Sequence, residues 1–298
     1  MTQDIQDHVS IFQLESSAVR GRAIQLGSAL DIAIGENRYP DRISRLLGEA
    51  MMIAAIIARA LKFDGRLIVQ CHGTNDGAIS LLMADCTSAG DIRGYARWNK
   101  EQLKMLELDH RNPGADVLLG KGTFSMTIDQ GPDMDQYQGL ATIEGQSLAE
   151  CAEHYFAQSE QIPTRIKLAV GQSQTPGNTP SWRGGGMMIQ RIATDETRSN
   201  TENDWQTAEA LFDTLSDEEL IDPELPHDTL IYRLFHESGV RLENKVSITA
   251  NCGCSEERLL STLKSFDKSA IEDMAVDNII TANCEFCGSE YHFDVDAI

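Results

Sequence analysis

The chain has 298 residues, of which 41% are hydrophobic, and a formal net charge of −21. This length suffices for one large domain or two smaller ones, and no apolar run approaches the about 20 residues that a membrane-spanning helix needs. The polar, acidic N-terminus lacks the basic start and apolar stretch of a signal peptide, so a soluble cytoplasmic protein without a membrane partner is expected.

The negative charge is concentrated in the C-terminal third. Residues 195–298 carry 24 acidic and 7 basic residues, whereas residues 1–194 carry a net charge of only −4. Because an anionic surface repels phosphate backbones, nucleic acid is disfavoured as a partner. Two interpretations of the most acidic stretch, residues 195–230, stay open. It is either a solvated face that keeps the protein soluble or a self-repelling segment of low stability that is poised to open.

Residues 1–194 show the pattern of several short strands and a few helices. An apolar helical repeat begins after Pro40 and continues to Leu61; it is apolar on nearly every side, so this helix should be buried. A Ser147–Glu150 capping box should start a second helix that reaches about Gln158. Strand-like runs cover residues 9–14, 19–23, 66–71, 78–85, 123–129, 139–144, 165–170 and 187–192. Without regular βαβ alternation, this order predicts an α+β core domain of antiparallel sheets covered by helices.

Two glycine-containing stretches are assigned to turns. Residues 74–77 separate two strand-like runs, so a hairpin is predicted in which Gly77 adopts a positive φ. The glycines at 184–186 resemble a phosphate-binding loop only in glycine content, because the Lys-Ser/Thr that follows such loops is missing. They are therefore interpreted as a turn before a strand.

The composition changes after Thr194. Residues 195–204 are polar and have no period, as expected of a linker. An apolar stripe at helical spacing follows, then a capping box at Ser216 and Glu219, and two prolines before the helical pattern resumes at residues 230–236. Such a segment cannot bury its apolar groups alone, so it should lie on the first domain or on a partner. The stripe consists of Trp205, Ala208, Leu211, Phe212 and Leu215.

Four of the seven cysteines lie close together near the C-terminus. They are spaced as Cys-x-Cys, then 29 residues, then Cys-x-x-Cys. Two close pairs of thiols separated by a short folded segment are typical of tetrahedral zinc sites. We therefore predict one zinc ion bound by Cys252, Cys254, Cys284 and Cys287; the competing interpretation is four inert buried cysteines.

The residues between the two pairs support a small folded module. Residues 255–266 predict an amphipathic helix with Leu259, Leu260 and Leu263 facing inward, and a capping box at Ser269 and Glu272 should start another short helix. Residues 279–282 and 291–293 flank the second pair as the arms of a hairpin. The turn between them is interpreted as a zinc knuckle in which Gly288 permits the tight turn.

The spacing within each pair also suggests redox chemistry. Alternate Cα atoms of an extended chain are about 6.6–7.2 Å apart, at or beyond the upper limit of disulfide geometry of about 6.8 Å. A Cys252–Cys254 disulfide would therefore bend the backbone at Gly253. Cys284 and Cys287 have the spacing of redox-active dithiols. We hypothesise that an oxidant converts the zinc site into two local disulfides and removes most of the folding free energy of the module.

The remaining cysteines are expected to be core residues. Cys71, Cys86 and Cys151 lie in apolar patterns, and His72 should point away from Cys71 because neighbouring strand residues face opposite sides. Residues 1–194 contain no recognisable nucleophile, carboxylate or phosphate-loop constellation. The sequence therefore does not predict an enzyme.

Over essentially its whole length the chain resembles the heat-shock protein 33 family, the redox-regulated 33 kDa chaperonins. The resemblance rests on Cys252-Gly-Cys254-Ser255, on Cys284-Glu-Phe-Cys287-Gly288 with Tyr291 and Phe293 after it, and on residues 91–95, 155–164 and 185–190. It implies an α+β chaperone core at residues 1–194, an acidic helical linker at 195–250 and a zinc-binding redox-switch module at 251–298.

The resemblance also implies an ATP-independent holdase. The reduced protein would bind one Zn²⁺ and be inactive. Oxidation would form the disulfides Cys252–Cys254 and Cys284–Cys287, release zinc and loosen the linker, so that the protein can form a homodimer and hold unfolded client proteins. The alternatives are a zinc-ribbon protein that binds nucleic acid, which the charge disfavours, and a thiol oxidoreductase using Cys284 and Cys287, which their hairpin-like context disfavours.

Overall fold

The computed structural model describes residues 7–35, 39–59, 64–131, 134–173, 180–192, 201–243 and 245–298. The chain divides into two compact units, Met1–Ala250 and Asn251–Ile298. Within these described ranges, no helix combines the length and apolarity needed to cross a membrane.

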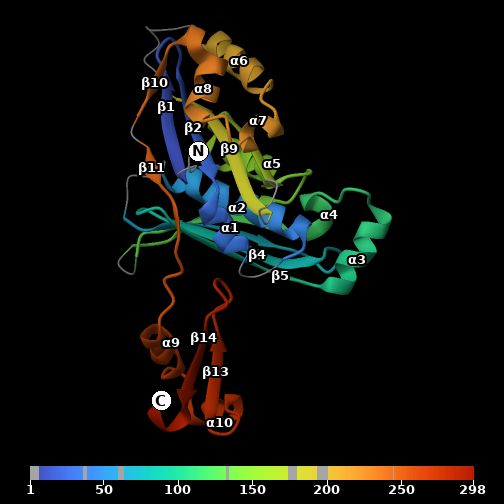
Figure 1. Ribbon diagram of the computed structural model, residues 1–298, viewed down its shortest axis with the longest axis vertical. Coiled ribbons are helices and arrows are strands. Elements are labelled where there is room, and N and C mark those ends of the chain that lie inside the picture. The colour runs from blue at the N-terminus through green and yellow to red at the C-terminus, as the bar shows by residue number, and fades with distance from the viewer. Residues whose placement is uncertain are drawn as a thin grey trace. The chain divides into compact units, whose positions relative to one another are not determined.

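Two six-stranded sheets dominate the first unit (Figure 1). Sheet A has the order β10-β1-β2-β9-β8, with β11 also paired to β1, and sheet B has the order β12-β5-β4-β3-β6-β7. Among the described strands every pairing is antiparallel except that of β12 with β5. The strands of sheet A are β1 (His8–Leu14), β2 (Val19–Leu26), β8 (Thr164–Ser173), β9 (Ser181–Arg191), β10 (Val240–Leu242) and β11 (Val246–Ser247). Those of sheet B are β3 (Arg66–His72), β4 (Ile79–Thr87), β5 (Asp91–Trp98), β6 (Thr123–Asp129), β7 (Tyr137–Thr142) and β12 (Thr249–Ala250).

Helices α1 (Ser28–Gly35) and α2 (Asp41–Ala58) contact both sheets. Helix α2 packs on β3, β4 and β5 of sheet B and on β2, β8 and β9 of sheet A. Fourteen of its 18 residues are buried, which confirms the predicted buried helix. It ends at Ala58, before the predicted end at Leu61, and residues 60–63 lie outside the described part of the chain.

Further helices in the described part of the core are α3 (Lys100–Asp109), α4 (Ala115–Leu119) and α5 (Leu148–Tyr155). Helix α5 begins where predicted, because the Ser147 hydroxyl accepts the Glu150 backbone N–H. The Glu150 carboxylate accepts the N–H of Gln146 rather than that of Ser147, so the predicted reciprocal box is only half formed. A π-helical turn, Phe156–Glu160, continues α5 to the predicted end.

The structure corrects the predicted role of Gly77. The hairpin between β3 and β4 is present, but Gly77 does not have a positive φ. A Cβ at this position would lie 2.5 Å from the carbonyl carbon of Leu119 at the end of α4. Glycine is needed here for close backbone approach and not for turn geometry.

The acidic segment covers the face of sheet A opposite α2. It forms α6 (Thr201–Phe212), α7 (Asp217–Ile221) and α8 (His227–Phe235), which lie beside β1, β2 and β9 in Figure 1. Met188 joins the core around α2, whereas its neighbour Met187 packs with the acidic segment, as alternation along a strand requires. The predicted apolar stripe is therefore confirmed to pack on the first domain. Residues 201–204, predicted as linker, belong to α6, and residues 193–200 lie outside the described part.

The second unit is a small module of two helices and a hairpin. It contains α9 (Glu256–Leu263), α10 (Lys268–Met274), β13 (Ile279–Asn283) and β14 (Glu290–Asp294). Its core holds only four buried apolar residues: Leu263, Ile271, Ile280 and Phe293. Helix α10 is capped by Asp267, which accepts the Ala270 N–H, so the predicted capping box at Ser269 and Glu272 was wrong. A core of this size is a weak source of folding free energy, as expected of a module that relies on a metal.

Candidate functional site: a cysteine cluster and a docked acidic segment

The structure brings the four C-terminal cysteines together within the second unit. Cys252 and Cys254 precede α9, and Cys284 and Cys287 lie in the turn between β13 and β14. The Sγ–Sγ distances are 3.6 Å for Cys252–Cys284 and 3.4 Å for Cys254–Cys287, and all four sulfurs lie within 4.8 Å of one another. Four thiolates about 2.3 Å from one Zn²⁺ would be about 3.8 Å apart. The four cysteines therefore could hold a metal ion.

The turn that carries Cys284 and Cys287 has the geometry of a tight knuckle. Gly288 has a φ of +71°, and its N–H donates to the Cys284 carbonyl at 2.8 Å. The Cys284 N–H donates in turn to the Ser289 carbonyl at 2.9 Å. The predicted need for glycine at position 288 is confirmed, because a positive φ is unfavourable for residues with a side chain.

Side chains not predicted from the sequence surround the sulfurs. The Tyr291 hydroxyl lies 3.1 Å from the Cys254 Sγ, and Arg258 Nη1 donates to the Gly253 carbonyl at 2.7 Å. Tyr291 pairs with Ala282, two residues before Cys284, so a register assigned to the hairpin would have placed it near the cluster. The sequence contains no comparable indication for Arg258, because its contact with Gly253 depends on the path of the chain into α9.

The environment of the thiols differs across the cluster. Burial raises the pKa of Cys287, but hydrogen bonds from Ser289 and the neighbouring thiols outweigh it and lower the pKa to about 7. At Cys254, burial is the larger effect and the pKa is raised. Since thiolate is the metal-binding and nucleophilic form, the lowered pKa favours that form at Cys287.

The other three cysteines are core residues, as predicted. Cys71, Cys86 and Cys151 are fully buried, and His72 is exposed on the opposite face of β3. Burial raises the pKa of Cys86 to about 12 and that of Cys151 to about 11, and it raises that of Cys71 further. These thiols stay protonated at neutral pH and are poor nucleophiles.

Gly185, the middle residue of the glycine triplet in β9, determines how closely the acidic segment can approach. These residues lie within the strand, so the predicted turn at 184–186 was wrong. A Cβ on Gly185 would lie 1.9 Å from the Leu220 carbonyl oxygen in α7 and 3.2 Å from His227 Cε1 in α8. Only a glycine lets the backbone of α7 contact the backbone of the sheet.

Basic side chains of sheet A pair with carboxylates of the acidic segment. Arg165 Nη2 lies 2.8 Å from Asp213 Oδ1, and the guanidinium carbon lies 6.0 Å from the centre of the Phe212 ring. Lys167 Nζ lies 3.8 Å from Asp217 Oδ1. Further ion pairs join Arg165 to Glu209 and Arg191 to Glu202. Lys245, which directly precedes β11, pairs with Asp228. Partly exposed ion pairs contribute about 0.2–1 kcal/mol each to the free energy of docking. The buried apolar contacts therefore supply most of that free energy, and the ion pairs favour one position of the segment on the sheet.

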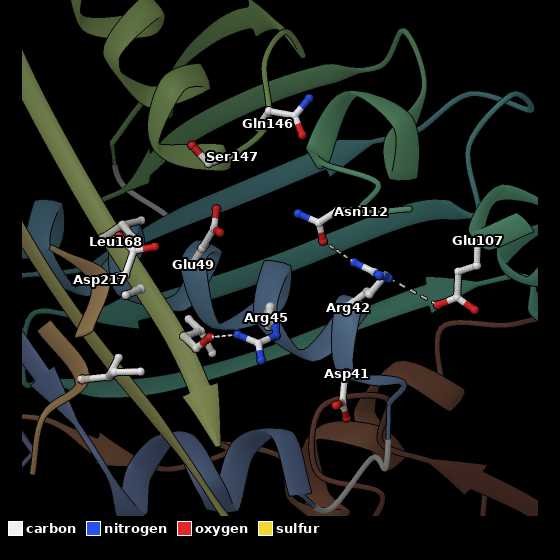
Figure 2. A pocket seen from close by; sticks show the side chains of 13 residues that line it. Asp41, Arg42, Arg45, Glu49, Glu107, Asn112, Gln146, Ser147, Leu168 and Asp217 are labelled. Carbon is white, nitrogen blue, oxygen red and sulfur yellow. Dashed lines mark hydrogen bonds and ion pairs between the residues drawn. The ribbon is translucent and has the colours of Figure 1, made fainter. Parts of the chain in front are cut away.

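A polar cavity of ≈ 700 Å³ lies between α2, β8 and α7 (Figure 2). Its charged groups are largely satisfied within the protein: Arg42 donates to Asn112 Oδ1 at 2.6 Å, and Glu49 accepts the Leu148 N–H at 2.8 Å. Burial raises the pKa of Glu49 to about 7, although the Leu148 hydrogen bond opposes the shift. Asp217 and Ile221 of α7 form one wall, so release of the acidic segment would remove that wall.

His227 makes docking of the acidic segment sensitive to acid. The ring is buried, with Nε2 2.9 Å from the Leu220 carbonyl oxygen. Burial lowers its pKa to about 4; His8 and Lys245 act in the same direction, whereas the Leu220 hydrogen bond and Asp228 oppose it. Because the folded pKa lies below the ordinary value of 6.5, protonation favours the open form. The stabilisation is complete above pH 6.5 and is lost as the pH falls toward 4, by on the order of 3 kcal/mol.

This acid sensitivity is measurable through Trp205 of α6, whose side chain is buried in the core that the acidic segment forms with sheet A. In a W98F/W182F background, acrylamide quenching of Trp205 should increase as the pH falls from 6.5 to 4. The His227→Gln variant keeps a donor for Leu220 but cannot titrate, so its quenching should change less over this range. Equal pH profiles for the two proteins would show that His227 does not control docking.

Comparisons with known proteins identify the family. A family model described as "Hsp33 protein" matches residues 7–294. A 33 kDa chaperonin of Caulobacter vibrioides is 46% identical over 291 residues, covering 97% of this chain and 95% of the relative. A 33 kDa chaperonin of Azotobacter vinelandii is 34% identical over 300 residues, covering 98% and 93%.

A solved structure supports the α+β fold. The crystal structure of a 33 kDa chaperonin (heat shock protein 33 homolog) from Thermotoga maritima matches with a TM-score of 0.79 at 21% identity, covering 98% of this chain and 96% of the other. The family assignment takes the place of the zinc-ribbon and thiol-oxidoreductase alternatives. The chain belongs to the Hsp33 family, whose curated members are named chaperonins, and it is accordingly a chaperone and not an enzyme.

Proposed function

We propose that this protein is a redox-regulated, ATP-independent cytoplasmic holdase for unfolding client proteins. In the reduced form, Cys252, Cys254, Cys284 and Cys287 bind one Zn²⁺, and the acidic segment stays docked on sheet A. The observation that supports this most directly is the clustering of the four sulfurs within 4.8 Å in a module with only four buried apolar residues. When bound, the metal supplies the folding free energy that this core lacks.

The proposed switch is the loss of thiolate ligands by oxidation. Hydrogen peroxide accepts two electrons from each pair of thiolates, its O–O bond breaks, and with two protons taken up from water its oxygens leave as two water molecules as each disulfide forms. The proposed pairs are Cys252–Cys254 and Cys284–Cys287. The shortest Sγ–Sγ contacts instead join Cys252 to Cys284 and Cys254 to Cys287. Disulfide mapping of the oxidised protein therefore distinguishes local pairs from crossed pairs.

The chain connectivity supports coupling between the module and the acidic segment. Strand β12 ends at Ala250, two residues before Cys252, and the segment between α8 and the module adds β10, β11 and β12 to the sheets of the core. These strands have only two or three residues each, so they should open at low free-energy cost once the module no longer anchors them. We propose a functional division into a core at 1–194, a linker at 195–250 and a switch at 251–298, and a homodimer in the oxidised state.

Peroxide titration tests the switch. We expect loss of four free thiols, release of one Zn²⁺ per chain and the appearance of aggregation-suppressing activity to follow the same course. Zinc is measured with a chromogenic chelator, thiols by alkylation and mass spectrometry, and activity by light scattering of a thermally unfolding client. The switch is refuted if activity appears while all four thiols remain metal-bound.

A further inference from the structure

The four long strands of sheet A are basic in an otherwise acidic protein. Strands β1, β2, β8 and β9 contain no Asp or Glu, although the chain has 46 acidic residues and a net charge of −21. Six Arg or Lys side chains lie in these strands: Arg20, Arg22, Arg165, Lys167, Arg183 and Arg191. Three of them, Arg165, Lys167 and Arg191, pair with carboxylates of the acidic segment.

The face of sheet A that the acidic segment covers is also apolar. Phe12, Ala23, Met187 and Ile189 of the sheet form one core with Trp205, Phe212, Leu230 and Phe235 of the acidic segment. Removal of that segment would therefore expose a surface on which apolar groups lie beside Lys167 and Arg191, which would lose these partners, and beside Arg165, which would keep its ion pair with Glu153 of α5 at 3.5 Å. Large exposed apolar patches bordered by polar groups mark protein interaction sites.

We propose that this face, once uncovered, prefers client segments that are both apolar and acidic over apolar segments that are neutral or basic. The inference rests on the proposed function, in which the segment leaves the sheet on activation. Its physical basis is charge complementarity: the acidic segment on this face presents Glu209 and Asp213 to Arg165, and Asp217 to Lys167. Apolar contacts supply most of the affinity, and the cations favour acidic over neutral or basic segments.

A pair of peptides tests the charge preference. Both are amphipathic helices as long as α6–α8, unrelated to this sequence, with an apolar stripe of Leu and Phe. One carries Glu on its polar face and the other carries Gln at the same positions. Binding of the fluorescein-labelled peptides to the full-length oxidised chain is measured by anisotropy. We expect the Glu peptide to bind about tenfold more tightly, as several partly exposed ion pairs of about 0.2–1 kcal/mol each would give.

Charge-reversal variants locate the preference on sheet A. R165E/K167E should abolish the preference for the Glu peptide. The control K104E/K121E makes the same change in net charge at two exposed positions, one in α3 and one between α4 and β6, and should retain the preference. High salt should reduce the preference of the wild-type chain, because screening at 1 M limits charge interactions to about 3 Å.

The outcomes separate this inference from the proposed function. Equal binding of the two peptides to an oxidised chain that suppresses client aggregation would overturn the charge preference and leave the function standing. Retention of the preference by R165E/K167E would show that Arg165 and Lys167, the cations that face Glu209, Asp213 and Asp217, do not cause it, and would overturn the inference. Failure of the oxidised wild-type chain to suppress aggregation of a thermally unfolding client would overturn the proposed function, and the inference with it.

Discussion

Replacing Gly185 with alanine is expected to activate the protein while its cysteines remain reduced and its zinc bound. The new Cβ would lie 1.9 Å from the Leu220 carbonyl oxygen, in a place where backbone faces backbone and no flexible side chain can yield. Overpacking of this kind costs about 1–3 kcal/mol, so the ratio of docked to undocked acidic segment should fall roughly 5- to 150-fold. Gly185→Val should displace the segment further if alanine is tolerated by a shift of α7.

Three measurements define this result. Hydrogen exchange of residues 201–235 should accelerate in reduced G185A, zinc content should stay at the wild-type value, and light scattering should show client protection without oxidant. Gly35→Ala is the matched control, because a Cβ there meets no atom within 4 Å. A reduced G185A protein with fast exchange but no protection would show that uncovering sheet A is not sufficient for activity.

The parts of the fold that the sequence predicted best have strong local signals. The apolar residues on nearly every side of α2 predict a buried helix, and the helix is buried. The capping box at Ser216 and Glu219 is formed as predicted at the start of α7. The hairpin of β13 and β14 follows from its alternation and from Gly288. In each case the cause lies within a few residues of the pattern, so tertiary contacts did not need to be known.

The misassigned glycines show where local patterns are insufficient. Gly77 and Gly185 are required because backbone from a distant part of the chain, at Leu119 and Leu220 respectively, lies against them. Their sequence neighbourhoods are those of ordinary turns, so local pattern alone could not reveal the contact. The same holds for the basic groups of sheet A, whose partners are at least 11 residues away in sequence, in the acidic segment.

The cysteine cluster was predictable as a set because ligand spacing is itself a local signal. The side chains around these cysteines could not be predicted in the same way. The Tyr291 hydroxyl and the Arg258 guanidinium contact the segment of Cys252–Cys254 only because the module folds as it does. Docking of the acidic segment was expected from its apolar stripe. The choice between an inert solvated face and a releasable cover depends on the energetics of the sheet A contacts, which composition alone does not provide.

Cys284→Ser is expected to give a chaperone that is active without oxidant and contains less than one zinc per chain. A hydroxyl does not replace the thiolate ligand, and structural zinc contributes about 10–16 kcal/mol to the folding of small modules. The module retains only Leu263, Ile271, Ile280 and Phe293 as its apolar core, so loss of even part of this free energy should unfold it. Metal analysis and hydrogen exchange of residues 251–298 measure both effects.

The matched control for thiol loss is Cys151→Ala, since Cys151 is buried in α5, outside the cluster. It should bind one zinc and remain inactive when reduced. If C284S loses its zinc but residues 201–235 stay protected and the protein is inactive, the module does not hold the acidic segment in place.

Combining C284S with G185A tests the order of events. If module unfolding acts only by releasing the segment from sheet A, the double variant should be no more active than the more active single variant, because both changes remove the same contact. Additive activation would instead require a second effect of the unfolded module, such as direct binding of clients by its exposed apolar residues.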